Sequence, residues 1–205
     1  MEKTPEQLSN AAKEIWARIS PALQDMGMKD RLAIPKQEMP SQAPEVRRHN
    51  TSEVALGFTV EQALVEANRC LQCKKQPCAE GCPVKLPIRD FVGKIAKGDF
   101  AASIALIKQH SLLPAICGRI CPQETQCQAH CTVGKSLKSV DSAVSIGRLE
   151  RFVADLESAK GATLPPVKPE TGRKVAVVGS GPSGLVVAAD VRREGHDVTV
   201  FDALH

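Results

Sequence analysis

The chain has 205 residues, of which 42% are hydrophobic, 24% charged and only 3% aromatic, and its formal net charge is +4. This length allows one or two domains, and so small and dispersed a charge argues against a nucleic acid or an anionic membrane as partner. There is no apolar run of about 18 residues to span a membrane, and the N-terminus MEKTPEQLSN lacks the apolar core of a signal peptide, so we expect a cytoplasmic protein with reduced or metal-bound cysteines.

Residues 1–50 predict an N-terminal helix followed by an extended arm. Thr4 and Gln7 form a capping box, and apolar residues follow at helical spacing until Pro21, which should end the helix. Residues 34–50 contain three prolines and little periodicity. We expect this arm to be extended and exposed.

Residues 51–160 predict a mainly helical domain. A second capping box, at Thr59 and Gln62, begins a helix that ends near the first cysteine. Helical apolar patterns then recur at 88–97, from Phe100 to about Gln109, and at 142–158.

All eight cysteines lie in this helical region, in two groups of four. The first group reads Cys70-x2-Cys73-x4-Cys78-x3-Cys82-Pro83, and the second reads Cys117-x3-Cys121-Pro122-x4-Cys127-x3-Cys131. The first resembles the ferredoxin run that ends in Cys-Pro, although its middle gap is four residues and not two. Eight soft thiolates in two groups match the ligands of two [4Fe–4S] clusters.

Zinc is the alternative metal. Zinc ribbons generally use two Cys-x2-Cys pairs, whereas only Cys70 and Cys73 have that spacing here. His130, beside Cys131, is a conceivable metal ligand, but a surface or packing role is the simpler interpretation. Disulfides and plain buried cysteines remain as further alternatives.

The pattern changes after a linker at 161–172, which is rich in proline and glycine. Residues 174–178 form a short apolar run typical of a buried parallel strand, and 197–201 read as a second strand. With a helix between them, 173–205 predict the start of a Rossmann-type domain. The expected fold class is therefore a mainly α domain followed by an incomplete α/β βαβ unit.

A glycine-rich loop follows the first of these strands. It reads Gly179-Ser180-Gly181-Pro182-Ser183-Gly184, and Asp202 ends the second strand 18 residues after the last glycine. In this context the loop predicts a dinucleotide site, with pyrophosphate at the helix N-terminus and the acidic residue on a ribose. The fingerprint does not distinguish FAD from NAD. A tight turn without a ligand is the alternative interpretation.

These motifs together resemble one family. The segments NRCLQCKKQPCAEGCPV, LPAICGRICPQETQCQAHC, AVSIGRLERFV and KVAVVGSGPSGL are similar to the small (beta) subunit of NADPH-dependent glutamate synthase. The same module occurs in dihydropyrimidine dehydrogenase and in the large subunit of NADH-dependent ferredoxin–NADP oxidoreductase. The resemblance covers roughly residues 35–205.

The resemblance implies crossed ligand sets for two [4Fe–4S] clusters. One cluster would take Cys70, Cys73, Cys78 and Cys131. The other would take Cys82, Cys121, Cys127 and a carboxylate, Glu150, with Cys117 left as a bystander.

The resemblance also implies FAD on the glycine-rich loop, NADPH or NADH as substrate, and electrons passing through the clusters to a partner subunit. That partner would resemble the glutamate synthase large subunit or the ferredoxin–NADP oxidoreductase small subunit. Full-length members continue well beyond the second strand, so we expect this chain to be a fragment or a truncated reading frame that is inactive alone. The alternative function is a ferredoxin-like carrier or interaction module without hydride chemistry.

Overall fold

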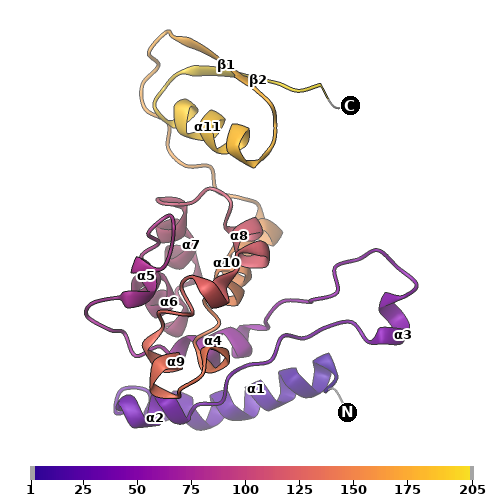
Figure 1. Cartoon of the computed structure of the whole chain (residues 1–205), viewed down its shortest axis with the longest axis vertical. Coiled ribbons are helices and arrows are strands. Elements are labelled where there is room, and N and C mark those ends of the chain that lie inside the picture. Colours follow the sequence, from indigo (N-terminus) through magenta and orange to yellow (C-terminus); the bar gives the residue numbers. More distant parts are fainter. Residues whose placement is uncertain (1–2, 204–205) are drawn as a thin grey trace.

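The computed structural model describes residues 3–203, as a helical part joined by a linker to a small βαβ unit (Figure 1). Its elements in chain order are α1 (Pro5–Ile19), η1 (Ser20–Ala22), α2 (Met28–Ala33), α3 (Pro44–Arg47), α4 (Val60–Asn68), α5 (Pro77–Glu80), α6 (Ile88–Ala96), α7 (Phe100–Lys108), α8 (Pro114–Ile120), η2 (Gln123–Thr125), α9 (Thr132–Ser136), η3 (Val140–Ser142), α10 (Ile146–Lys160), β1 (Lys174–Val178), α11 (Pro182–Arg193) and β2 (Asp197–Phe201). Within the described residues, none of the helices is long and apolar enough to cross a membrane. The expected fold class, a helical domain followed by an incomplete Rossmann-type unit, is confirmed.

Both predicted capping boxes are present. The hydroxyl of Thr4 accepts from the backbone N–H of Gln7, and the hydroxyl of Thr59 accepts in the same way from Gln62. The glutamine side chain returns a bond to the capping backbone in each case. α1 ends at Ile19, before Pro21, as the sequence predicted.

The arm differs from the expectation of an exposed, extended segment. It contains the short helix α3, and Ile34, Gln37 and Pro40 are buried. The cause is a set of polar contacts with α4: the backbone N–H of Gln37 donates to Glu66, and the side chain of Gln62 donates to the carbonyl of Glu38. The first half of the arm is thus part of the helical domain.

The core of the helical part lies between α4, α6, α7 and α10. Phe91, Val92 and Ile95 on α6 are fully buried, as is Leu149 on α10. The ring of Phe100 meets that of Phe152 edge to face at 5.2 Å between centroids. The helical stripe predicted at 88–97 is therefore the one that faces this core.

α10 begins later than its sequence pattern suggested. The segment from Val140 to Ser142 is a 3-10 turn, and the α-helix begins at Ile146. The backbone N–H of Ser145 donates to the carboxylate of Glu66 on α4, which fixes the entry of the chain into α10. Local periodicity could not show this long-range bond.

In the βαβ unit, β1 and β2 pair in parallel, with Lys174 opposite Asp197 and Val178 opposite Phe201. α11 crosses between them (Figure 1). Few of its apolar side chains are enclosed: Val178 is 87% exposed and Phe201 is 54% exposed.

Candidate functional site

The eight cysteines lie in short helices, at their ends or in the turns between them. Cys70 and Cys73 follow α4, Cys78 lies in α5, and Cys131 is the residue that caps α9. The others are placed by the turn after α5, by α8 and by the segment after η2; they are Cys82, Cys117, Cys121 and Cys127. All eight lie within the described residues, and none forms a disulfide.

The first donor set consists of Cys70, Cys73, Cys78 and Cys131. These four side chains line one small cavity, of about 20 Å³, that is otherwise mainly apolar. They surround this cavity and do not converge on a point: in residues 3–203 no three His, Cys, Asp or Glu side chains are arranged to hold a single metal ion. The set joins cysteines from both sequence groups.

Two polar contacts reach the first donor set. The amide of Gln72 donates to the sulfur of Cys70 at 3.3 Å, and the sulfur of Cys73 lies 3.2 Å from the hydroxyl of Thr132. Gln72 and Gln76 adopt left-handed backbone conformations, with φ of +52° and +45°. Such conformations are unfavourable outside glycine and tend to occur at functional loops.

The second predicted donor set is Cys82, Cys121, Cys127 and Glu150. Burial, then the neighbouring Cys117, Glu150 and Cys82, raise the pKa of the Cys121 thiol to about 11. Burial also raises the pKa of the Cys127 thiol to about 12, with Cys82 next in effect. Cys82 and Glu150 are far from Cys121 and Cys127 in the sequence but lie near them in space.

Glu150 is the member of this set that is least consistent with an ordinary structural role. It is 5% exposed, and its Oε1 atom is buried without a hydrogen-bond partner. Burial raises the pKa of its carboxyl to about 7. Because a buried, unpaired carboxylate oxygen is costly, this atom fits a ligand role better than a packing role.

Both sets are suited to a metal cluster in their chemistry. The pKa values of Cys70 and Cys78 are likewise raised, to about 11 and about 12, chiefly by burial. Thiols in such surroundings are neutral without a metal, and they become thiolates when a cation compensates the charge.

Cys117 and His130 are not members of the two predicted sets, although Cys117 adjoins Cys121. The sulfur of Cys117 lies 3.9 Å from the hydroxyl of Ser111, and beside Cys121. His130 is exposed, and its ring lies over Gly81, where any added Cβ would collide with it.

The glycine-rich loop joins β1 to α11. Gly179 has a φ of +100°, which favours glycine, and Gly181 is the residue preceding the first turn of α11. The backbone N–H and the hydroxyl of Ser180 both donate to the carboxylate of Asp202. Asp202 therefore lies against the loop, and its role toward a ribose stays a prediction.

A larger cavity lies away from these donors. It has a volume of about 610 Å³, is mainly apolar, and lies between α7, α10, the linker and Arg193 of α11. None of the site residues predicted from the sequence lines it.

Residues 47–162 match the family model described as dihydropyrimidine dehydrogenase domain II, 4Fe-4S cluster. The chain belongs to this family. Residues 177–205 match a second model, described as an NAD(P)-binding Rossmann-like domain. The predicted resemblance is thereby confirmed for both parts of the chain.

Curated relatives agree with this family. The chain is 36% identical over 150 residues to the NAD-dependent dihydropyrimidine dehydrogenase subunit PreT of Escherichia coli (strain K12), over 73% of this chain and 35% of that protein. It is 34% identical over 168 residues to the glutamate synthase [NADPH] small chain of Azospirillum brasilense, over 81% of this chain and 34% of that protein. It is 35% identical over 208 residues to the putative oxidoreductase AegA of Escherichia coli (strain K12), over 98% of this chain and 29% of that protein. The chain thus spans about a third of the length of the curated relatives it matches.

One structural feature of this 4Fe-4S domain escaped the sequence interpretation. Glu66 and Arg69, on the turn before Cys70, form a fully buried ion pair at 2.7 Å. Arg69 also donates to the carbonyls of Ile34, Ser142 and Ala143. The available signal was an acidic and a basic residue, three positions apart, at the end of the helix that leads to Cys70.

Proposed function

We propose that the chain is the electron-transfer part of an NAD(P)H-dependent flavin and iron–sulfur oxidoreductase. Its task is to pass electrons between FAD and a partner subunit through two [4Fe–4S] clusters. The observation that carries this proposal is the grouping of donors: thiols from two separate sequence runs lie together in two sets, and a buried carboxylate with an unpartnered oxygen belongs to one of them.

We assign the ligands accordingly. Cys70, Cys73, Cys78 and Cys131 hold the first cluster, and the cavity that they line together supports this assignment. The second cluster is held by Cys82, Cys121, Cys127 and Glu150.

Bound four-iron clusters supply one-electron transfer. The residues of this chain provide thiolates, and each raised thiol pKa implies that a proton leaves when its ligand binds iron. The amide of Gln72, which donates to Cys70, stabilises negative charge on that sulfur. Cys78 adjoins both Cys70 of the first set and Cys127 of the second, so the two sets are neighbours.

The glycine-rich loop has the nucleotide role. Gly179 makes the tight turn, and Gly181 lets the backbone approach the pyrophosphate of FAD at the N-terminus of α11, where Pro182 and Ser183 begin the helix. Gly184 allows α11 to pack closely on the loop, since an added Cβ would collide with the carbonyl oxygen of Gly179, and Asp202 binds the ribose. NADPH or NADH is the hydride donor in the whole protein. A partner subunit of the kind found in glutamate synthase or in ferredoxin–NADP oxidoreductase completes the path.

Anaerobic reconstitution tests the cluster proposal. The protein should then contain about eight irons and absorb broadly at about 400 nm. Cys121→Ser should lose one cluster, whereas the matched variant Cys117→Ser should keep both. Zinc bound in preference to iron, or equal iron content in the two variants, would contradict the assignment.

Glu150 has its own test. A carboxylate is a harder donor than a thiolate and concentrates charge on one iron, so Glu150→Cys should keep the cluster and shift its reduction potential. Glu150→Ala should make that cluster labile or convert it to a three-iron form, seen by electron spin resonance. Unchanged iron content, spectrum and potential in Glu150→Ala would transfer the assignment to Cys117.

A carrier without hydride chemistry is the second candidate, and it is favoured by the exposed sheet. Val178 and Phe201 lie largely in solvent, so residues 3–203 enclose little of a flavin site. We expect this chain alone to bind FAD weakly and to oxidise no NAD(P)H. Tight, stoichiometric FAD binding in an absorbance titration would exclude this version of the function.

A further inference from the structure

The helix α8 is locked against α10 at one point of backbone contact. A Cβ atom added to Gly118 would lie 2.7 Å from the backbone nitrogen of Arg151 and 2.8 Å from the carbonyl oxygen of Gly147. α8 leads into Cys121, and α10 carries Glu150. Any shift between these helices therefore changes the distance between two members of the second donor set.

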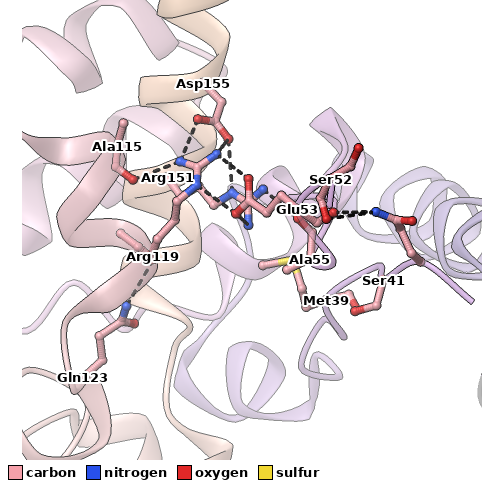
Figure 2. Close-up of polar contacts among 12 residues, drawn as sticks. Met39, Ser41, Ser52, Glu53, Ala55, Ala115, Arg119, Gln123, Arg151 and Asp155 are labelled. Carbon is pink, nitrogen blue, oxygen red and sulfur yellow. Dashed lines mark hydrogen bonds and ion pairs between the residues drawn. The ribbon is translucent and has the colours of Figure 1, made fainter. Parts of the chain in front are cut away.

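Four charged side chains form a network of ion pairs across α8 and α10 (Figure 2). They are Glu53, Arg119, Arg151 and Asp155. The Nη1 and Nη2 atoms of Arg119 donate to the two oxygens of Asp155, each at 2.9 Å. Its Nε and Nη2 atoms donate to the two oxygens of Glu53, at 2.9 and 3.1 Å. Arg119 on α8 is thus paired with two carboxylates, one on α10 and one in the segment between α3 and α4.

Arg151 completes the network from α10. It pairs with Glu53 at 3.0 Å and with Asp155 at 3.1 Å, and its Nη2 donates to the carbonyl of Ala55. The two arginines and two carboxylates of the network have no net charge. They come from α8, α10 and the segment with Glu53, which meet in Figure 2.

A structural surface role is the simplest alternative, since isolated exposed ion pairs contribute little. This network differs in geometry and burial. The contacts of Arg119 are bidentate, and the side chain of Arg151 is only 6% exposed. Its two arginines also flank the close contact in sequence: Arg119 follows Gly118, and Arg151, whose backbone nitrogen makes that contact, follows Glu150.

We propose that Arg119 is a positioning residue for the second cluster: it holds α8 on α10 so that Cys121 and Glu150 remain at one site. This inference rests on the proposed function and adds a residue to it. Arg119 touches no cluster atom in this role. It acts through the helix pair, and its positive charge also favours the reduced, more negative cluster.

Two parent variants isolate the clusters. Cys73→Ser should keep only the second cluster, and Cys121→Ser only the first. If these parents do not each hold one cluster, the ligand assignment is wrong and the inference fails with it. If they do, the effect of Arg119 can be read for each cluster separately.

Arg119→Met is then added to each parent. With Cys73→Ser, iron should be lost to a chelator about ten-fold faster, the lower end of the effect of partners that orient metal ligands, and the reduction potential should fall. With Cys121→Ser, neither quantity should change. Arg48→Met is the matched control, because Arg48 lies a few residues before Glu53 in the sequence and forms an exposed pair with Glu45.

Arg119→Lys separates charge from geometry. Lysine keeps the charge but cannot bridge two carboxylates with a planar fork, so the potential should be retained while iron loss is still accelerated. If Arg119→Met is poorly folded, the same measurements on Arg119→Lys and Glu53→Gln decide. Equal iron loss with and without the change at Arg119, or equal acceleration at both clusters, would overturn the inference.

Discussion

The helical domain and the βαβ unit follow local sequence rules equally well, but they bury very different amounts of their apolar side chains. In the helical domain Phe91, Val92 and Leu149 are fully buried. Among the described residues of the βαβ unit, 173–203, the buried apolar ones are Val177 and Ala188, although the strands have the predicted bounds. Correct local structure and a stabilising core are therefore separate properties.

The two regions also differ in their charges. The ion pair of Glu66 and Arg69 is enclosed and bonded to two other segments, 34–37 and 142–145, whereas that of Lys168 and Glu194 is exposed, with both side chains more than half accessible. Buried pairs depend strongly on both partners, and exposed pairs do not. Matched substitutions in the two regions test whether this difference in burial produces a difference in stability.

The largest effect is expected from Glu66→Ala. It would leave the buried guanidinium of Arg69 without its counter-ion, and the backbone N–H groups of Gln37 and Ser145 without their acceptor. Loss of one partner of a buried pair costs about 3–5 kcal/mol. Urea unfolding of the metal-free protein would measure this loss; the matched variant Lys168→Met should leave the midpoint unchanged. Similar midpoints for the two variants would contradict the comparison.

A second test compares apolar residues. Phe91→Ala removes a fully buried ring and should cost about 3–5 kcal/mol. Val178→Ala removes a side chain that is 87% exposed and should change the stability by less than about 0.5 kcal/mol. A large loss in Val178→Ala would show that the βαβ unit has a core that its burial does not reveal.

The parts of this fold that could be predicted from the sequence depend on near neighbours. Capping at Thr4 and Thr59, the stripe of α6 and the strand bounds each follow from residues within a few positions. Most of residues 41–50 are exposed as expected, but the first half of the arm is partly buried because Gln37 is held by Glu66, 29 residues away. Periodicity carries no information on such pairs.

The candidate site also has features that the sequence predicted and features that depend on tertiary packing. Cysteine spacing indicated clusters, and the family match supports a 4Fe-4S domain, but only family resemblance suggested Glu150. Its burial, and the network that joins Arg119 to Glu53, 66 residues apart, arise from tertiary packing. The ligand sets and domain bounds stay predictions.

The smallest of the three effects is expected from Gly118→Ala, and it tests whether the close contact of α8 and α10 is what distinguishes the helical domain. The new methyl would lie 2.7 Å from the backbone nitrogen of Arg151, and a backbone atom cannot rotate away as a side chain can. Overpacking of this kind costs about 1–3 kcal/mol. The helices must separate, so the second cluster should also be lost more readily than the first. Gly181→Ala is the matched variant in the βαβ unit, where nothing lies within 4 Å of the added Cβ, and its stability should be nearly that of the unchanged protein. Denaturant midpoints and iron release, measured on both variants, check this; a stable Gly118→Ala with normal iron retention would mean that the helix pair tolerates a wider spacing than the contact implies.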